Sequence, residues 1–198
     1  RKKDKTKMKI ILASASPRRK ELLKLMGINK FEVIVSNKEE KLQNNLNVEE
    51  QVEKLAMQKA ENVLEQTKGE DRIIIGADTI VVKNGKIYGK PKLREEAKEM
   101  IKELSGKKHQ VITGLCVIVE KQGKREQYLT HDTSNIWIKN MEEKEIDQWL
   151  NQNTYQDKAG AYAIQEEFGK YIEKIEGNYF GIVGLPIHLL YDILKKYE

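Results

Sequence analysis

A short apolar run that leads directly into a serine–proline step constrains the fold of this chain more than any other feature. Residues 10–12 are all apolar, which predicts a buried strand. Ser16 then occupies the position of a helix N-cap, and Pro17 occupies the first helical position. Leucine and methionine recur at helical spacing over residues 22–26, and Gly27 is a natural end for the helix. The sequence therefore predicts a strand, a tight turn and a helix in immediate succession.

The first turn of this helix carries cations, although the helix dipole already places positive partial charge there. Arg18, Arg19 and Lys20 should each cost about 0.3–1 kcal/mol at this end when exposed. A bound anion would remove the conflict, because backbone N–H groups, the dipole and the guanidinium groups would all face it. The alternative is a basic helix start that is simply solvated. Ser14 and Ser16 in the turn favour a phosphate site.

Residues 12–23 closely resemble the opening motif of the Maf-type nucleotide pyrophosphatases, and later motifs extend the resemblance from Lys9 to about Lys195. The resemblance implies an elongated, mixed and twisted sheet flanked by helices, with two lobes around a cleft, similar to the inosine triphosphate pyrophosphatases. The order of predicted strands and helices independently favours an α/β or mixed α+β fold. The resemblance also implies that the first motif contacts substrate through Ser14, Ser16, Arg18 and Arg19. Because members are often dimers, a homodimer is one expected assembly.

Length and composition limit the class of protein. The chain has 198 residues, 34% of them charged, with a net charge of +5. Charges of both signs are interspersed, which suits an anionic ligand without requiring nucleic acid, and no nucleic-acid recognition motif is present. No stretch has the apolar length of a membrane span or the form of a secretory signal. Cys116 is the only cysteine and is expected to be a buried structural thiol. We expect a cytoplasmic protein with no nucleic-acid or membrane partner.

The N-terminal residues are expected to lie outside the fold. Residues 1–7 are highly charged and precede Met8, near which the family pattern begins. We expect residues 1–7 to be a disordered or non-native extension and residues 8–198 to form a single Maf-like nucleotide pyrophosphatase domain.

A second helix is predicted to begin at Asn47, because Asn47 and Glu50 have the spacing of a capping box. Its apolar face includes Lys59, whose ammonium group either reaches the surface or meets an anion at the edge of the core. The family has a Lys-Ala step in this helix, which favours a phosphate contact for Lys59. A second strand is predicted over residues 31–35, and Glu39 and Glu40 lie in the polar loop between it and the helix. The resemblance places a glutamate of this loop at the catalytic cleft, and Glu40 is the better match.

An aspartate interrupts an otherwise apolar strand pattern over residues 73–82. A carboxylate there is costly unless it has a partner, binds a metal or lies at a cleft, although Asp78 could also cap a turn or bond Thr79. Gly76 and Ala77 before it allow close approach of a ligand or of another backbone. The family has the same Gly-Ala-Asp-Thr motif, and the resemblance makes Asp78 the leading catalytic candidate.

The strands and helices after residue 83 are predicted from weaker sequence patterns. The step Asn84-Gly85 predicts a hairpin that returns the chain towards Asp78 and carries Lys90, which matches a family lysine of the site. Strands are predicted over residues 110–119, 125–133 and 134–139. A helix capped by Asn140 and Glu143 should follow, and a last helix should begin at Pro186 and bury Ile187, Leu190, Tyr191 and Leu194. Isolated His109, His131 and His188 show no metal-ligand spacing.

Residues 157–165 are mostly small or polar and by themselves indicate only a loop beside a strand. The resemblance identifies them as the family's second signature and places them at the cleft. It implies substrate contacts by Asp157, Lys158 and Gln165.

The resemblance predicts a house-cleaning hydrolase that converts a nucleoside triphosphate to the monophosphate and pyrophosphate. Asp78, Glu40 and Lys90 are the expected catalytic residues, and Asp78 would orient or deprotonate the attacking water. Asp78 and Glu40 offer hard oxygen ligands suited to Mg²⁺ or Mn²⁺. The alternative is a non-catalytic nucleotide-binding regulator of septum formation.

Three positions favour dTTP and UTP over a methylated guanine nucleotide. Arg18 stands where the 7-methylguanosine-triphosphate subgroup has tryptophan, and a guanidinium group holds a cationic purine poorly. Thr79 offers a hydroxyl group to a base or sugar edge. Gln165 offers both a donor and an acceptor, which suits the paired carbonyl and N–H groups of uracil or thymine. The alternative is that Thr79 and Gln165 only satisfy backbone groups.

Overall fold

The computed structural model describes residues 8–43, 45–69 and 71–198, so the predicted extension 1–7 lies outside the described residues. Internal contacts divide the chain into two compact units. Unit 1 contains Arg1–Asp78, Gly114–His131 and Gly184–Glu198. Unit 2 contains Thr79–Thr113 and Asp132–Val183.

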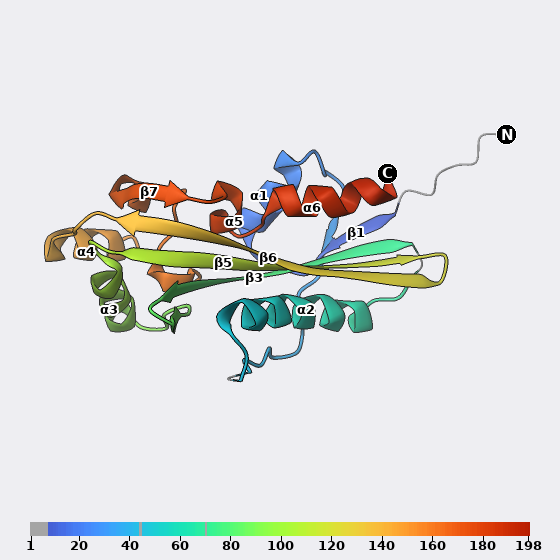
Figure 1. Ribbon diagram of the computed structural model, residues 1–198, viewed down its shortest axis with the longest axis horizontal. Coiled ribbons are helices and arrows are strands. Elements are labelled where there is room, and N and C mark those ends of the chain that lie inside the picture. Colours follow the sequence, from blue (N-terminus) through green and yellow to red (C-terminus); the bar gives the residue numbers. More distant parts are fainter. Residues whose placement is uncertain (1–7, 44, 70) are drawn as a thin grey trace. The chain divides into compact units, whose positions relative to one another are not determined.

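The strands of the described residues form one mixed sheet of seven strands in the order β2-β1-β3-β5-β6-β7, with β4 paired to β3 (Figure 1). The strands are β1 (Lys9–Leu12), β2 (Glu32–Val33), β3 (Arg72–Lys83), β4 (Lys86–Tyr88), β5 (Lys108–Lys121), β6 (Lys124–Ile138) and β7 (Ile172–Glu176). β1 is parallel to β2 and β3, whereas β4 is antiparallel to β3 and β7 is antiparallel to β6. The mixed α/β class and the flanked mixed sheet are as predicted.

Six α-helices and three short 3-10 helices accompany the described strands. The α-helices are α1 (Pro17–Leu25), α2 (Val48–Gln66), α3 (Arg94–Leu104), α4 (Glu143–Leu150), α5 (Tyr179–Val183) and α6 (Ile187–Leu194). The 3-10 helices are η1 (Ala159–Ala161), η2 (Glu167–Tyr171) and η3 (Lys195–Tyr197). None of the described helices combines the length and the apolar character needed to cross a bilayer.

The two helix starts predicted in unit 1 are confirmed. The Ser16 side chain caps α1 by accepting a hydrogen bond from the Arg19 N–H, and Pro17 is the first helical residue. Asn47 and Glu50 form the reciprocal capping box of α2. Local capping chemistry was therefore sufficient to locate both helices.

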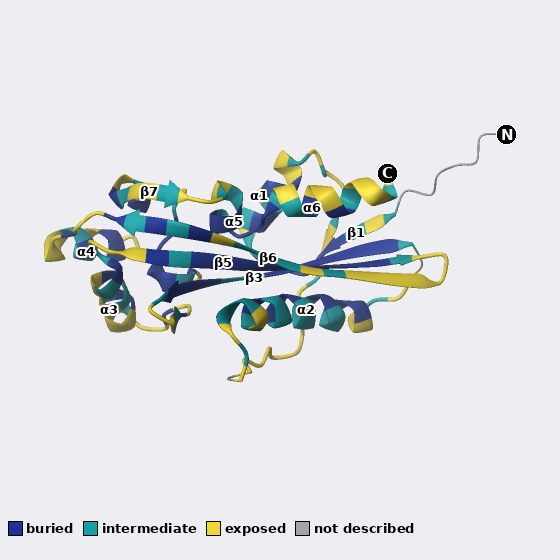
Figure 2. Cartoon of the chain, in the orientation of Figure 1, coloured by how far each residue is buried: buried dark blue, intermediate teal, exposed yellow. Residues whose placement is uncertain are grey.

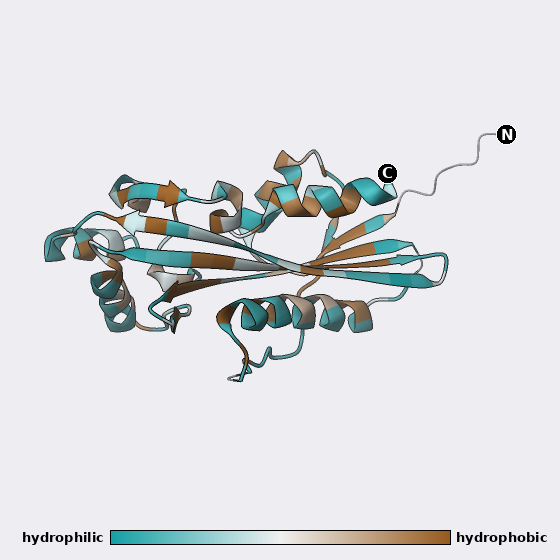
Figure 3. Ribbon diagram, viewed as in Figure 1, coloured by the Kyte–Doolittle hydropathy of each residue, from teal (hydrophilic) through white to brown (hydrophobic). Residues whose placement is uncertain are grey.

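Helix α2 packs on one side of the strands of unit 1, and α1 and α6 lie on the other side (Figure 1). Apolar and polar residues alternate along α2, and its apolar stripe packs on buried positions of β1, β3 and β5 (Figures 2 and 3). Two glycines allow this close packing. A Cβ atom at Gly76 would lie 2.5 Å from the Ala56 carbonyl oxygen, and one at Gly114 would lie 2.4 Å from the Val52 carbonyl oxygen. Gly76 thus permits the approach of another backbone, which is one of the two alternatives that the sequence left open.

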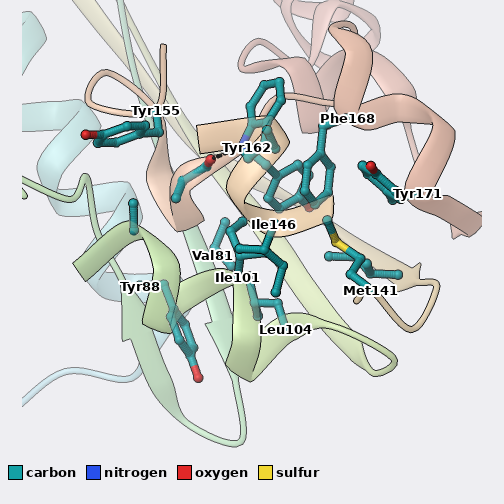
Figure 4. Close-up of a cluster of buried hydrophobic side chains, with 14 of the residues drawn as sticks. Val81, Tyr88, Ile101, Leu104, Met141, Ile146, Tyr155, Tyr162, Phe168 and Tyr171 are labelled. Atoms are coloured by element: carbon teal, nitrogen blue, oxygen red, sulfur yellow. Dashed lines mark hydrogen bonds between the residues drawn. The ribbon is translucent and has the colours of Figure 1, made fainter. Parts of the chain in front are cut away.

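The core of unit 2 is rich in aromatic side chains (Figure 4). Phe168 is fully buried and stacks on Tyr162 with ring centroids 4.6 Å apart. Trp149 and Tyr171 pack edge-on against Phe168. This cluster fixes the backbone on both sides of residue 165 in the second signature.

Four local predictions need correction. β6 is continuous through Ile138, so the strand expected over residues 134–139 is not separate. Helix α4 is capped by Glu142 with Glu145 rather than by Asn140 with Glu143. The strand expected over residues 31–35 shrinks to the exposed two-residue β2. Tyr191 is 55% exposed, because α6 directs only Leu190 and Ile193 fully into the core.

Candidate functional site

The predicted catalytic carboxylate forms an ion pair with the predicted phosphate-binding lysine. Asp78 Oδ1 lies 2.6 Å from Lys59 Nζ, and both side chains are nearly buried, at 19% and 18% exposure. Gly76 makes this contact possible, because successive side chains alternate along β3 and positions 76 and 78 both face α2. The anion that Lys59 meets at the edge of the core is therefore Asp78. Thr79, the next residue, points to the opposite side of the strand.

Glu40 lies in an exposed loop that is tied to α2. The Gln58 side chain accepts a hydrogen bond from the Lys41 N–H at 3.0 Å and donates one to the Lys41 carbonyl at 3.3 Å. Gln58 precedes Lys59, so this pair of bonds attaches the Glu40 loop to the part of α2 that carries the Asp78 partner. Sequence analysis did not identify Gln58.

The first motif folds so that Arg19 is buried, at 9% exposure. Its Nε donates to the carbonyl oxygen of Gly184 at 2.7 Å, and its Nη1 donates to Ser14 Oγ at 3.0 Å. The backbone N–H of Ser16 also donates to Ser14 Oγ, at 3.3 Å. Part of the conflict between Arg19 and the helix dipole is thus removed by protein acceptors, one of which lies in the turn before α6.

These bonds define what Ser14 can offer to a ligand. A serine hydroxyl has one proton and two acceptor lone pairs. Both acceptor positions of Ser14 face the Ser16 N–H and the Arg19 guanidinium group, so the remaining capacity is its O–H donor. A donor hydroxyl beside a buried guanidinium group suits an anionic oxygen.

The charge of Arg19 is embedded in a polar setting. Burial lowers the pKa of its guanidinium group from the ordinary value, the nearby Asp78 raises it, and Arg18 lowers it further. Arginine still remains protonated in proteins. Unit 1 therefore holds two cations, Arg19 and Lys59, within electrostatic reach of the Asp78 carboxylate.

In unit 2 the second signature is built around a buried lysine. The Lys158 side chain is only 4% exposed, and its ammonium group contacts the Thr154 carbonyl, Asp157 Oδ1 at 3.0 Å and Glu166 Oε1 at 3.2 Å. An ammonium group has three protons, and here each has an oxygen acceptor. Lys158 thus ties together the two ends of the loop, while its substrate contact stays a prediction.

Two further bonds hold the loop in place. The N–H of Gly160 donates to the Gly89 carbonyl at 3.1 Å, which puts the backbone next to exposed Lys90 against the second signature. The Trp149 indole N–H donates to the Ala161 carbonyl at 2.9 Å. Gln165 is exposed at the end of this fixed backbone, and Asp157 is exposed at its start.

A buried histidine anchors the same loop and was missed as a site-supporting residue. His109 Nε2 and the Tyr162 hydroxyl are 2.5 Å apart, and the His109 ring is 2% exposed. Burial, with a smaller contribution from Lys83, lowers the pKa of His109 to about 4. Burial also raises the pKa of Tyr162. Both groups are therefore neutral near pH 7, and their bond positions Tyr162 three residues before Gln165.

The described residues bring Asp78, Lys59 and Arg19 together in unit 1 and link the backbones of the Lys90 and Asp157–Gln165 segments in unit 2. Within the described part of the chain, no three histidine, cysteine, aspartate or glutamate side chains cluster in a way that could hold a metal ion.

Comparisons with known proteins identify relatives of this chain over nearly its whole length. The family model described as Maf-like protein matches residues 9–197. The chain is 47% identical over 190 residues to a dTTP/UTP pyrophosphatase of a Thermoanaerobacter species, covering 96% of both chains. It is 44% identical over 191 residues to a dTTP/UTP pyrophosphatase of Caldicellulosiruptor bescii, covering 95% of this chain and 94% of the relative. A HAM1 protein from Coxiella burnetii has a similar fold, with a TM-score of 0.52, 15% identity, and coverage of 96% of this chain and 100% of its own.

Proposed function

This chain belongs to the Maf-like protein family, and from that premise we propose that it hydrolyses dTTP and UTP to the monophosphate and pyrophosphate. Relatives at 42–47% identity over nearly the whole chain carry the name dTTP/UTP pyrophosphatase. The observation that carries the proposal is the Asp78–Lys59 ion pair beside the buried Arg19. It combines a base and two cations, which is what hydrolysis of a triphosphate requires.

In the proposed reaction, water attacks the α-phosphorus atom. A bond forms between the water oxygen and this phosphorus, the bond to the bridging oxygen of the β-phosphate breaks, and pyrophosphate leaves. Asp78 accepts the proton of the attacking water. Lys59 holds one oxygen of Asp78, which orients the carboxylate before the substrate binds.

The leaving pyrophosphate carries most of the developing charge, so cations and donors near it lower the barrier. Arg19 supplies a guanidinium group held by two protein acceptors, and Ser14 supplies its O–H donor. The backbone N–H groups at the start of α1 lie in the same turn. Arg18, Lys59 and Lys90 complete the proposed set of phosphate contacts.

A divalent cation, Mg²⁺ or Mn²⁺, fits the donors that the chain offers. Mg²⁺ is commonly bound through one or two carboxylates together with substrate phosphates and waters, so a cluster of three protein ligands is not required. Asp78 and Glu40 are the proposed protein ligands, and the ion would neutralise phosphate charge. Lys59 engages Oδ1 of Asp78, and the other carboxylate oxygen, Oδ2, is the proposed metal ligand.

The base would be recognised through unit 2. Gln165 is an exposed amide on a rigid loop, and an amide can both donate to a uracil carbonyl and accept from the N3–H group. Thr79 supplies a hydroxyl, and Asp157 and Lys158 belong to the same segment. Because the 5-methyl group is not part of this edge, dTTP and UTP should both be accepted.

The proposed enzyme works in the cytoplasm on free nucleotides and not on nucleic acid. The support is the chemistry of the substrate, a free nucleoside triphosphate. We expect a homodimer, which sedimentation of the purified chain would test.

The experiment is a panel of dTTP, UTP, CTP, GTP and 7-methyl-GTP, each with Mg²⁺ or Mn²⁺, with separate detection of pyrophosphate and inorganic phosphate. We expect pyrophosphate and the nucleoside monophosphate from dTTP and UTP. Release of inorganic phosphate would exclude attack at the α-phosphorus, and a preference for 7-methyl-GTP would exclude the assigned bases. An Asp78→Asn preparation made in parallel reports contaminating activity.

A further inference from the structure

Helix α2 binds the loop that precedes it through a row of three carboxamide side chains. Gln58, Asn62 and Gln66 follow one another at intervals of four residues, so they lie on the same side of the helix. All three contact residues 35–41, in the segment between β2 and α2 that runs beside the helix (Figure 1). We call these three side chains the amide row. The function proposed above uses Glu40 of this loop but leaves the amide row without a role.

The two glutamines of the amide row bind the backbone at the two ends of the loop. Gln66 donates to the Val35 carbonyl at 3.1 Å and accepts a hydrogen bond from the Asn37 N–H at 3.2 Å. Gln58 donates to the Lys41 carbonyl at 3.3 Å and accepts from the Lys41 N–H at 3.0 Å. A carboxamide has both a donor and an acceptor, so each glutamine pairs with a peptide N–H and C=O, as a neighbouring strand would. The path of the loop backbone is therefore fixed at both ends.

Polar contacts also hold the middle of the loop. Asn62 donates to Ser36 Oγ at 2.9 Å, and the Lys38 N–H donates to the same oxygen at 3.3 Å. The Lys38 ammonium group pairs with Glu65 of α2. The apolar side chain of Val35, by contrast, is exposed. Hydrogen bonds are directional and add little net stability where water competes for them, so these contacts determine where the loop lies more than they stabilise the fold.

The anchored loop presents two carboxylates to solvent. Glu39 and Glu40 lie between Lys38 and Lys41, and both are exposed. Among the described residues, neither carboxylate has a hydrogen-bond or ion-pair partner. The two bonds of Gln58 end on the residue directly after Glu40, so they fix the backbone from which the Glu40 side chain extends. Movement of the backbone at Lys41 would displace the Glu40 carboxylate with it.

We propose that Gln58 is a positioning residue for the divalent cation, because it holds the Lys41 backbone so that the Glu40 carboxylate is in place before the metal binds. This inference rests on the proposed function, which makes Glu40 a metal ligand. A ligand that is already in place loses less conformational freedom on binding, so the metal binds more tightly. Asn62 and Gln66 hold the more distant part of the loop and contribute less. The coupling is reciprocal, so a metal ion bound to Glu40 must also keep the loop on α2.

The first test measures Mn²⁺ affinity in Gln58→Met, which keeps the length of the side chain and removes both hydrogen bonds. Mn²⁺ is titrated in the presence of α,β-imido-UTP, whose α–β bridge resists hydrolysis, and electron paramagnetic resonance reports the unbound ion. We expect the dissociation constant of Mn²⁺ to rise about tenfold in Gln58→Met and less in Gln66→Met. Gln51 of α2 donates to the Leu46 carbonyl at 2.8 Å, outside the loop. Gln51→Met is therefore the matched control and should leave the dissociation constant unchanged.

The second test measures the reciprocal effect by hydrogen exchange of the amides of residues 35–41. In wild-type protein, adding Mn²⁺ to the complex with α,β-imido-UTP should slow this exchange, and Glu40→Gln should abolish the slowing. This test answers the question even if Gln58→Met does not fold. An unchanged Mn²⁺ dissociation constant in folded Gln58→Met, or a loop that Mn²⁺ does not protect in wild-type protein, would overturn the proposal. Absence of UTP hydrolysis by wild-type protein would instead refute the proposed function.

Discussion

Lys59 in unit 1 and Lys158 in unit 2 both belong to motifs of the candidate site, yet their surroundings differ. Among the described residues, Lys59 pairs with the carboxylate of Asp78, and its side chain is 18% exposed. Lys158 has three oxygen partners and is 4% exposed. An ammonium group with one partner near the surface can exchange that partner for a phosphate. One whose three protons are all bonded inside the fold cannot do so without breaking its loop.

We propose that unit 1 supplies charges that rearrange around a triphosphate, because Lys59 and Arg19 lie near Asp78. In unit 2, Lys158 and the neutral His109 and Tyr162 hold the 157–165 loop in place. If this comparison is right, substitutions in unit 1 should reduce the binding or turnover of all nucleoside triphosphates to the same extent. Substitutions that loosen unit 2 should affect stability and the choice of base.

Asp78→Asn removes the proposed catalytic base of unit 1 and should have the largest effect on turnover. The amide cannot accept the proton of water, so kcat should fall by about 10²–10⁴-fold for every nucleotide. Steady-state rates of pyrophosphate release measure this. Asp192→Asn, an exposed carboxylate of α6 in the same unit, should leave the rates unchanged. Near-normal turnover by Asp78→Asn would remove Asp78 from the mechanism.

Arg19→Ala should weaken triphosphate binding by about 1.5–3 kcal/mol, the range for a charge-assisted hydrogen bond. The loss should be equal for UTP and CTP, because Arg19 faces the phosphate end. Binding of a non-hydrolysable analogue by calorimetry measures it. The matched control is Arg125→Ala, whose exposed guanidinium group pairs with Glu120 in unit 1. A base-dependent loss in Arg19→Ala would break the proposed division between the units.

Lys158→Met should lower the free energy of unfolding by about 1.5–3 kcal/mol, because the Lys158 side chain is buried and its ammonium group contacts three oxygen atoms. Urea denaturation followed by circular dichroism measures the change. Lys170→Met removes an exposed ion pair with Glu167 and should cost less than about 1 kcal/mol. If Lys158→Met instead kept full stability and lost only nucleotide affinity, Lys158 would resemble Lys59 and the comparison would fail.

The pH dependence of stability tests the neutral His109. Its folded pKa of about 4 lies below the ordinary 6.5, so the unfolded chain binds this proton more tightly. The contribution of His109 to stability is therefore complete above pH 6.5 and is lost as the pH falls towards 4. Between pH 7 and pH 5 we expect about 2 kcal/mol of loss from this group. His109→Gln should remove that part of the pH dependence, whereas His131→Gln should retain it.

Much of unit 1 followed from local patterns in the sequence. Ser16 and Pro17 located α1, and the Asn47–Glu50 pair located α2, because capping is decided by residues three apart. The unfavourable position of Arg19 at the N-terminal end of a helix correctly indicated that this arginine has an unusual environment. Its partner Gly184 lies 165 residues away, and no local pattern can predict such a contact.

Unit 2 was harder to predict, because its loop is held by long-range contacts. Residues 157–165 indicate only a loop, and the burial of Lys158 depends on Glu166 and on the backbone of Thr154. The tie between His109 and Tyr162 joins residues 53 positions apart. The family resemblance identified this segment as part of the site. It did not predict that each proton of the Lys158 ammonium group has an oxygen acceptor.

The reactivity of Cys116 can report how often helix α2 separates from the sheet. It is the only cysteine, it is fully buried between β5 and α2, and burial raises its pKa to about 12. Thiol reagents attack the thiolate, so the folded protein should be inert to them near pH 8, whereas an unfolded chain should react readily. The rate of alkylation would therefore measure how often α2 lifts from the sheet, without any engineered label. Nucleotide that binds Lys59 on α2 should slow that rate.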